Sequence, residues 1–299
     1  MKKVFLFLFI INQINAQKIT LKGKLVNQKT KEPIAYANIS FLDENNGISS
    51  NDEGYFSFQI EKELLKKKVH ISCLNFKDTV VLASTLENNV LHLQPKEYVL
   101  EEVSISKKID KELKVDKYRR KHIKSAFGGR QSIPWIVTKY FRFKEEYNKT
   151  PYLKEIVIYF SSMLGRKKSK FRIRLFKIDK ISGKPSEDLT DKSIIAFSRK
   201  IDGKVKVDIS KLDIEFPKEG FFVGLERIHI PFNFYEYTYT MQGSNKKYTA
   251  KAIAPSFGAV YTNDTIFTYS QGKWRKFYSP QNFYNGNNLE PAISLTLSN

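Results

Sequence analysis

Residues 33–58 read PIAYANISFLDENNGISSNDEGYFSF, and this stretch carries the clearest structural signal in the chain. Apolar and polar residues alternate through Ile34–Leu42 and again through Tyr55–Ile60. A period of two residues is typical of a strand with one buried face. Gly47 and Gly54 follow polar runs, where hairpin turns need residues that tolerate positive φ. The stretch therefore predicts consecutive β-strands joined by tight turns.

Short strands continue on both sides of this stretch. Turn signals separate them about every 8 to 12 residues, which indicates a β-sandwich. Only residues 61–68 interrupt the pattern, and we expect a polar helical turn or a long loop there. These observations assign residues 17–106 to one all-β domain. The further predicted strands are Lys18–Val26, Val69–Leu74, Thr79–Leu82, Val90–Leu93 and Val99–Ile105.

The residues of this domain resemble the carboxypeptidase-like regulatory domain family, whose pattern has the form G…P…A-N-V…G-T…D-x-x-G-x-F. The resemblance implies a prealbumin-like or immunoglobulin-like sandwich with no chemistry of its own. Two turn positions depart from the pattern, because Asn51 stands where the family often has Asp and Asn75-Phe76 where it often has Gly-Tyr. The matching residues are Gly23, Pro33, Ala37-Asn38-Ile39, Gly47, Gly54 and Phe56, with Leu100–Ile105 similar to the strand that closes the module in many outer-envelope proteins.

A basic segment, Lys107–Arg130, follows this domain, with 10 basic against 3 acidic residues. Its apolar residues recur at roughly helical spacing up to Gly128-Gly129. We predict one amphipathic helix and assign residues 107–134 to a basic helical connector. An interfacial, lipid-binding helix is one interpretation. The thin apolar stripe favours the other, a solvated helix docked between two sandwiches.

The remaining residues, 135–299, again show many short strand patterns and almost no helical periodicity. We predict a jelly-roll-like β-sandwich. The run Phe171–Ile178 and its continuation to Glu226 are similar to an accessory β-sandwich found beside such regulatory modules in exported proteins. The predicted strands are Trp135–Phe143, Tyr152–Ser161, Phe171–Ile178, Ser193–Phe197, Val205–Ile209, Phe221–Ile230, Phe234–Met241, Lys247–Ile253, Thr265–Tyr269, Trp274–Phe277 and Ala292–Leu297.

Residues Met1–Ala16 have the order of a cleavable secretory signal peptide. Lys2 and Lys3 precede an apolar run, Val4–Ile11, and a small residue precedes Gln17. The apolar run is much shorter than the roughly 20 residues that span a bilayer as a helix. No lipid-attachment cysteine follows it, and no other segment is apolar enough to span a membrane. We expect an exported protein that is periplasmic, associated with the outer envelope, or secreted.

The net charge is +20 and the isoelectric point about 9.7. Only 10 of the 51 basic residues are Arg, the side chain that reads phosphates and bases through a planar fork. Because the chain is also expected to be exported, nucleic acid is not an expected partner. Solvated surface charge is the favoured interpretation, with attraction to envelope polyanions as the alternative. The single cysteine, Cys73, forms no internal disulfide and is expected to be a small core residue.

Motifs for catalysis or cofactors do not emerge. The four histidines lack metal-binding spacing, and no G-x-S-x-G, P-loop or dinucleotide fingerprint occurs. Glu145, Glu146 and Glu226 could act as glycosidase carboxylates, but no pairing is visible. Exposed charge or a strand-end ion pair is the favoured interpretation for them. We predict no catalytic residue, cofactor or metal site.

Aromatic residues are the remaining binding signal. Tyr235, Tyr237 and Tyr239 alternate along one strand and share a face. Trp274, Tyr278 and Tyr284 lie in a loop-rich segment near the end of the chain. Exposed aromatic rings stack on sugars or peptides, whereas buried rings fill a sandwich core, and the core interpretation is favoured. These six residues are the candidate ligand-binding set.

Together these observations predict a non-catalytic, exported binding or accessory protein of the bacterial cell envelope, with a glycan or an envelope protein as its partner. One alternative is a hydrolase with an unfamiliar site in residues 135–299. Another is a structural or assembly component of the envelope. The sequence does not indicate an oligomeric state.

Overall fold

The computed structural model describes residues 17–97, 110–129, 132–161, 168–198, 203–279 and 286–299. Within these ranges the chain forms β-strands and short 3₁₀ turns of at most five residues, which confirms the all-β prediction. The predicted signal, Met1–Ala16, and the predicted strand Val99–Ile105 lie outside the described residues. The 3₁₀ turns are η1 (Lys62–Lys66), η2 (Ala83–Leu86), η3 (Arg120–His122), η4 (Glu145–Lys149), η5 (Ser210–Leu212) and η6 (Pro231–Asn233).

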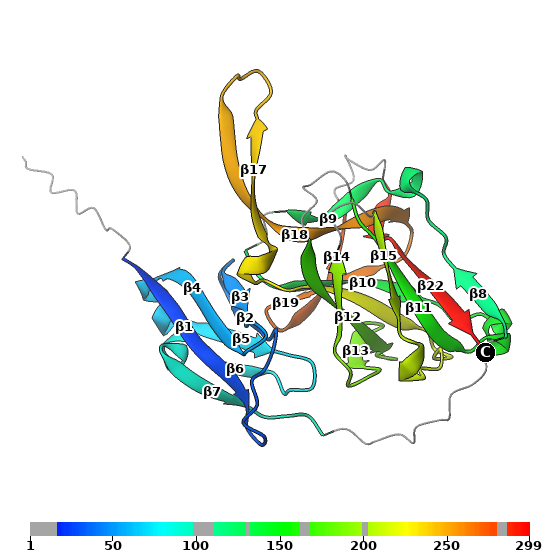
Figure 1. Ribbon diagram of the computed structural model, residues 1–299, viewed down its shortest axis with the longest axis horizontal. Coiled ribbons are helices and arrows are strands. Elements are labelled where there is room, and N and C mark those ends of the chain that lie inside the picture. The colour runs from blue at the N-terminus through cyan, green and yellow to red at the C-terminus, as the bar shows by residue number, and fades with distance from the viewer. Residues whose placement is uncertain (1–16, 98–109, 130–131, 162–167, 199–202, 280–285) are drawn as a thin grey trace, which may run out of the picture.

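The N-terminal unit is a sandwich of two small sheets (Figure 1). One sheet has the order β4-β1-β7 and the other β3-β2-β5-β6. Their facing side chains form a core that includes Leu21, Leu25, Ile39 and Ile71. The strands are β1 (Lys18–Asn27), β2 (Asn38–Phe41), β3 (Gly47–Ser49), β4 (Tyr55–Glu61), β5 (Lys68–Ser72), β6 (Thr79–Leu82) and β7 (Asn89–Leu93).

The two glycines expected at turns behave differently. Gly54 has φ +80°, as a tight turn requires. The turn prediction for Gly47 is wrong, because this residue begins β3. A side chain there is excluded by close approach instead, since an added Cβ would lie 2.6 Å from the carbonyl oxygen of Ile39 and 3.0 Å from Cδ of Pro134. Gly47 therefore lets the C-terminal unit pack against β2 and β3.

The helix predicted for the basic connector is also wrong in its described part, residues 110–129. This segment contains β8 (Glu112–Val115), the turn η3 and β9 (Ser125–Gly129). β8 pairs with the last strand and β9 with a long strand of the C-terminal unit. Leu113 and Val115 are two residues apart and both pack on that unit's core, as residues on one face of a strand do. The helical spacing of the apolar residues in this segment is too weak to indicate its structure.

The C-terminal unit contains three further sheets. The largest has the order β13-β12-β16-β10-β19-β20, with β14 also paired to β12. The others are β15-β11-β22-β8 and β17-β18-β21, with β9 also paired to β18. The strands are β10 (Trp135–Phe141), β11 (Tyr152–Tyr159), β12 (Ser169–Ile178), β13 (Pro185–Asp188), β14 (Ile194–Ser198), β15 (Lys204–Asp208), β16 (Phe221–Arg227), β17 (Phe234–Thr240), β18 (Lys247–Thr262), β19 (Ile266–Ser270), β20 (Lys273–Phe277), β21 (Asn288–Pro291) and β22 (Ile293–Ser298).

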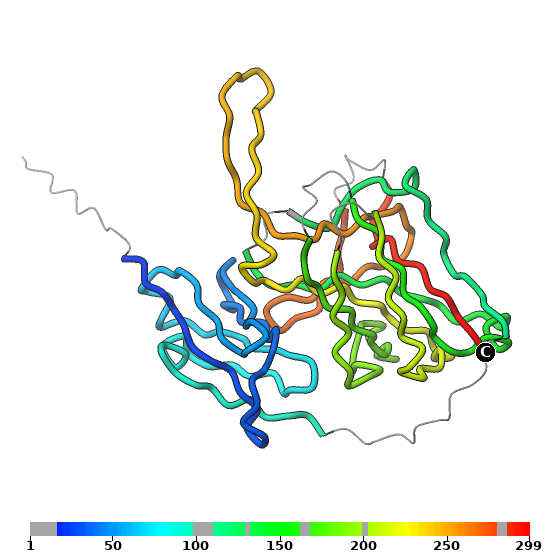
Figure 2. Tube along the Cα trace, viewed as in Figure 1, coloured from blue at the N-terminus to red at the C-terminus, as the bar shows by residue number. Residues whose placement is uncertain are grey.

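The main core of the C-terminal unit lies between the large sheet and the sheet that contains β11 and β22. Leu175 of β12 and Val223 of β16 belong to the same buried cluster as Ile156 of β11 and Leu295 of β22. The opposite face of the large sheet meets the N-terminal unit, since Glu226 and Arg172 on that face bind Asn38 and the carbonyl oxygen of Ala35. Figure 2 shows the N-terminal unit, in blue to cyan, beside the C-terminal unit. The central strands of the large sheet are therefore buried on both faces, which is why β16 is buried along its whole length.

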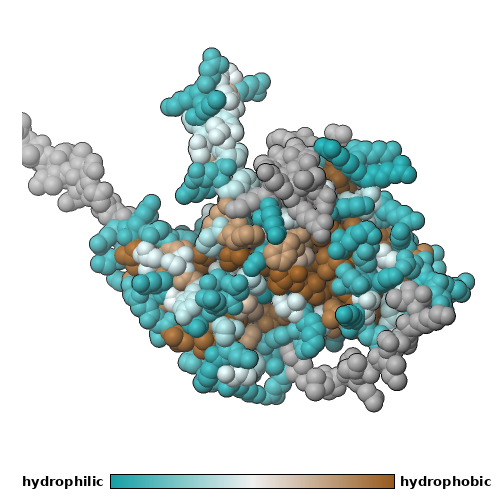
Figure 3. Space-filling model, viewed as in Figure 1, coloured by the Kyte–Doolittle hydropathy of each residue, from teal (hydrophilic) through white to brown (hydrophobic). Residues whose placement is uncertain are grey.

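A two-stranded arm projects from this body (Figures 1 and 2). It consists of β17 and the first part of β18, joined by residues 241–246. The surface of the arm is white to teal on the hydropathy scale, whereas brown apolar residues gather over the body (Figure 3).

Candidate functional site

The strand β12 presents two kinds of side chain to its two sides. Ile173 and Leu175 point into the main core of the C-terminal unit. Because side chains alternate along a strand, Arg172, Arg174 and Phe176 lie on the opposite face, toward the N-terminal unit. The junction between the two units is therefore built around charged residues.

Arg172 forms the centre of a buried network. Its Nη1 atom lies 3.2 Å from both carboxylate oxygens of Glu226, and the two side chains are 2% and 1% exposed. The same guanidinium group donates from Nη1 and Nη2 to the carbonyl oxygens of Tyr36 and Ala35, each at 3.2 Å. Its Nε atom donates to Ser193 Oγ at 3.1 Å. All three guanidinium nitrogens therefore have partners.

Glu226 also binds the N-terminal unit directly. Asn38 Nδ2 donates to Glu226 Oε1 at 2.6 Å, and Ser49 Oγ donates to Asn38 Oδ1 at 2.8 Å. The backbone N–H of His229 donates to Ser49 Oγ at 2.9 Å. Since a buried charge is tolerated when it is paired and hydrogen-bonded, this chain of contacts fixes the two units to each other.

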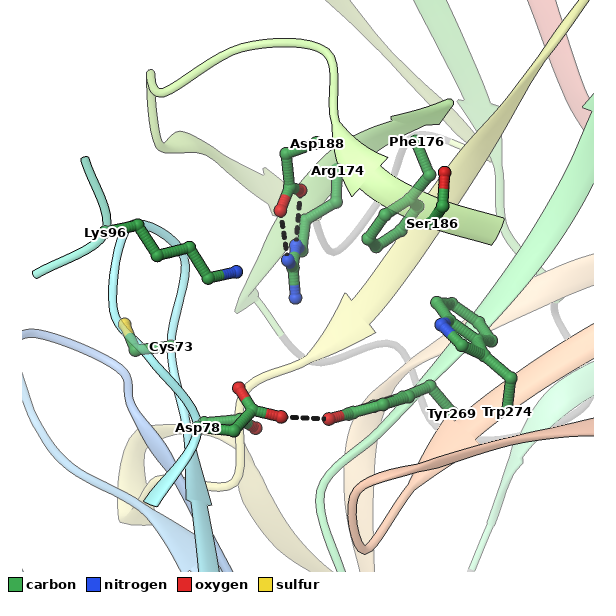
Figure 4. Close-up of a pocket in the computed structure, with 10 residues that line it drawn as sticks. Cys73, Asp78, Lys96, Arg174, Phe176, Ser186, Asp188, Tyr269 and Trp274 are labelled. Atoms are coloured by element: carbon green, nitrogen blue, oxygen red, sulfur yellow. Dashed lines mark hydrogen bonds and ion pairs between the residues drawn. The ribbon is translucent and has the colours of Figure 1, made fainter. Parts of the chain in front are cut away.

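A pocket of about 150 Å³ opens at the same junction, beside this network (Figure 4). This volume is small for a ligand site and suits one sugar ring or one side chain better than an extended ligand. The N-terminal unit contributes one group of lining residues and the C-terminal unit the other. The lining residues are Ser72, Cys73, Asp78 and Lys96 from the first, and Arg174, Phe176, Ser186, Asp188, Tyr269 and Trp274 from the second.

Arg174 and Asp188 form a bidentate ion pair on one side of the pocket. Arg174 Nε donates to Asp188 Oδ1 at 2.8 Å, and Nη2 donates to Oδ2 at 2.5 Å. Burial alone would lower the pKa of Arg174, but the adjacent Asp188 carboxylate outweighs it and raises this pKa. Nη1 of Arg174 has no hydrogen-bond partner among the described residues, and Figure 4 shows it pointing into the pocket.

Asp78 lies on the opposite side of the pocket. Its Oδ2 atom accepts a hydrogen bond from the Tyr269 hydroxyl at 2.9 Å and lies 2.9 Å from His70 Nε2. Burial on its own would raise the pKa of Asp78, but the hydrogen bonds from His70 and Tyr269 lower it below its usual value. The amine of Lys96 points toward Arg174 across the pocket in Figure 4.

Aromatic rings form the wall that faces these charges. The ring centroid of Trp274 lies 5.2 Å from that of Phe176 and 5.0 Å from that of Tyr269. Gly224 on β16 makes room for this wall, because an added Cβ would lie 2.6 Å from the Phe176 ring. Trp274 is half-buried, so part of its ring remains available beside the pocket.

Cys73 lines the pocket but is not a reactive thiol. It is buried, and its Sγ lies 3.7 Å from the carbonyl oxygen of Ala35. Burial raises its pKa, an effect that the nearby Arg172 only partly offsets, so the thiol stays protonated near neutral pH. Among the described residues, no group of three or more His, Cys, Asp or Glu side chains is placed to hold a metal ion.

The structure separates the six candidate ligand-binding residues. Trp274 lines the pocket, whereas Tyr278 is 73% exposed beyond the end of β20 and does not line it. Tyr284 lies outside the described residues. The core interpretation is wrong for Tyr235, Tyr237 and Tyr239, which lie half-buried on the projecting arm. Their rings follow one another at 6.2 and 5.9 Å between centroids.

Glu226 was expected to be an exposed charge or a strand-end ion pair. The ion pair is formed, because Glu226 is the second-to-last residue of β16 and pairs with Arg172. The exposed-charge alternative is wrong, because both faces of β16 are covered and Glu226 is buried at the junction. Glu145 and Glu146 belong to η4 and are exposed. Glu145 accepts a hydrogen bond from Asn148, and no catalytic pairing with Glu226 is formed.

Sequence reasoning missed most of the charged lining of the pocket. Arg174, Asp188, Asp78 and Lys96 come from both units, and nothing in their spacing connects them. One signal was available, since two arginines alternate with Ile173 and Leu175 on β12. A strand with apolar residues on one face and arginines on the other can be buried on both sides only if carboxylates lie opposite the arginines.

Comparisons with known proteins place this geometry in context. Residues 21–105 match the family model described as CarboxypepD_reg-like domain. No protein of curated function matches the sequence. One similar solved structure is the crystal structure of the cysteine protease and lectin-like domains of Cwp84, a surface layer associated protein of Clostridium difficile. The TM-score is 0.34 and the identity 9%, over 55% of this chain and 32% of that chain. This likeness is too low to indicate a shared fold.

Proposed function

Since residues 21–105 form a CarboxypepD_reg-like domain, a non-catalytic type of regulatory or binding module, we propose that this chain is an exported binding protein of the cell envelope. Its ligand is a glycan, and one sugar unit of that glycan occupies the pocket between the two units. The N-terminal unit supplies part of the lining and, through the Arg172–Glu226 network, holds it in place.

The observation that carries this proposal is an aromatic wall that faces polar groups with further hydrogen-bonding capacity, in a pocket at the junction. Sugar rings pack their C–H faces on aromatic side chains such as Trp274. Their hydroxyl groups both donate and accept hydrogen bonds. Arg174 Nη1 and the Lys96 amine can donate to a hydroxyl oxygen, and Asp78 can accept from a hydroxyl proton. Ligand sites form preferentially at such junctions between domains.

The protonation states in the pocket favour binding over catalysis. A general acid near neutral pH needs a carboxyl group with a raised pKa, but the pKa of Asp78 is lowered. Both oxygens of Asp188 are held by Arg174, and the Cys73 thiol is protonated. These three groups therefore support binding by this pocket more than hydrolysis.

Export is the second part of the proposal. The charged start, short apolar run and small residue within Met1–Ala16 support it. Among the described residues, no helix is both long and apolar enough to cross a membrane. Fractionation of cells that express the chain tests this part. We expect the protein outside the cytoplasm, shortened by about the length of this segment, whereas full-length protein in the cytoplasm would contradict export.

Binding of the full chain to a panel of polysaccharides and oligosaccharides tests the ligand. Replacing Trp274 by Ala removes the aromatic wall, and we expect the affinity to fall at least tenfold, which corresponds to about 1.4 kcal/mol. Tyr278→Ala is the matched control, because it removes an exposed aromatic ring nearby that does not line the pocket. Isothermal titration calorimetry on the best ligand of the panel measures both.

Three outcomes would contradict the proposal. Equal losses for the two variants would place the binding surface elsewhere. Cleavage of the glycan by the wild-type chain would favour the hydrolase alternative. A stable protein partner recovered by crosslinking in cells, together with no glycan binding at all, would favour a structural or assembly role in the envelope.

A further inference from the structure

The projecting arm has two chemically different faces. On one face, Tyr235, Tyr237 and Tyr239 of β17 lie opposite Ala252, Ala250 and Tyr248 of β18. The rings of Tyr239 and Tyr248 stack at 5.7 Å between centroids. The other face carries the pairs Glu236–Lys251, Thr238–Thr249 and Thr240–Lys247. A ribbon of only two strands is marginally stable by itself, so this arm gains from a further strand.

The two edges of the arm also differ. In the described part of the chain, β17 has β18 as its single neighbouring strand and ends its sheet. The arm portion of β18 carries Lys247 and Lys251, and lysines on an edge oppose pairing with another strand. β17 has one charged residue, Glu236, among tyrosines and threonines, which favour strand pairing. One edge is thus protected against pairing and the other is not.

We propose that the edge of β17 pairs with β17 of a second copy of this chain, in antiparallel orientation about a two-fold axis. With Thr238 at the axis, Thr238 faces its own copy, Tyr237 faces Tyr239 of the partner and Glu236 faces Thr240 of the partner. This register places no like charges opposite each other. It joins the tyrosine faces of the two arms into one continuous surface on a four-stranded sheet.

The edge of β18 fits a second copy poorly. Antiparallel pairing about Thr249 would place Lys247 opposite Lys251 of the partner at both ends, and like charges directly opposite are destabilising. A symmetric contact uses the same surface on both copies, so these repulsions would occur twice. Charge therefore selects β17 as the edge that a second copy covers.

Light scattering after gel filtration of the full chain tests this proposal. We expect a dimer whose dissociation constant rises roughly tenfold or more in Thr238→Lys, since two lysines then face each other at the axis. Thr249→Lys is the matched control. This residue lies directly opposite Thr238 on the same exposed face of the arm, but on the edge that the dimer does not use.

A cysteine pair tests the register. Facing residues of antiparallel strands have Cα atoms about 4.5 to 5.5 Å apart, within the range of a disulfide. Mild oxidation should therefore link Thr238→Cys into a covalent dimer and leave Thr249→Cys without an intermolecular disulfide. The native Cys73 is buried and gives no background. A monomeric wild-type chain at every concentration, equal effects of the two lysine variants, or preferential crosslinking of Thr249→Cys would overturn the proposal.

Discussion

Arg172 and Arg174 lie two residues apart on β12, on the same face of the sheet, and each is paired with a buried carboxylate. Arg172 uses all three guanidinium nitrogens in contacts to Glu226, Ser193 and carbonyl oxygens of the N-terminal unit. Arg174 uses two nitrogens for Asp188, and its third faces the pocket. The side chain of Arg172 is 2% exposed and that of Arg174 11%.

This difference separates a structural ion pair from a group that can bind a ligand. A buried guanidinium group with every donor satisfied has nothing left to offer and serves to hold the two units together. A guanidinium group held by one carboxylate, with a donor still directed at an opening, is positioned for a ligand without further reorganisation. The two regions therefore predict different consequences for the same kind of substitution.

The largest effect is expected for Arg172→Met. This change leaves Glu226 buried without its cation, and breaking such a pair from one side costs about 3–5 kcal/mol of unfolding free energy. Urea denaturation of the full chain measures it. The double variant Arg172→Met with Glu226→Leu should recover most of this loss, because replacing both partners by apolar groups removes the unpaired charge.

The exposed pair Lys206–Glu155 provides the control for that measurement. Its nitrogen and oxygens are 3.1 and 3.2 Å apart, but the lysine side chain is 57% exposed. Lys206→Met should therefore change the unfolding free energy by about 1 kcal/mol or less. Similar losses for Arg172→Met and Lys206→Met would show that the junction network does not hold the two units together. Arg172 would then have no structural role that distinguishes it from Arg174.

The sequence predicts the strands and the aromatic part of the pocket better than its charged residues. Alternation located most strands, because a half-buried strand must place apolar residues on one face. It missed β3, β8, β9, β13 and β21, which have three to five residues each and are too short to show a clear alternation. It found the aromatic part of the pocket through Trp274. It could not find Asp78 or Asp188, because charged residues on polar turns and short strands look solvated until a second unit covers them.

A smaller effect is expected for Arg174→Lys. Lysine keeps the charge beside Asp188 but cannot form the bidentate contact and also direct a donor into the pocket. We expect a loss of about 1 kcal/mol in unfolding free energy and a fall in glycan affinity of roughly tenfold. Arg275→Lys is the control, since it makes the same exchange at an exposed position on β20. An unchanged affinity for Arg174→Lys would remove the proposed role of the third nitrogen.

The smallest effect concerns pH, which distinguishes the two regions through Asp78. The groups that face Asp78 are His70, Tyr269 and Lys96, and its pKa in the folded chain is lowered. An unfolded aspartate has a pKa of about 3.9. The contribution of Asp78 to stability is therefore fully present above about pH 4 and is lost as the pH falls through the lower, folded value.

We expect the urea midpoint of the wild-type chain to fall more steeply below about pH 4 than that of Asp78→Asn. The difference should be modest, because the Asp78 side chain is 46% exposed and solvent weakens its interactions. Parallel curves for the two proteins would mean that the contacts from His70 and Tyr269 do not stabilise the ionised form of Asp78 in the folded chain.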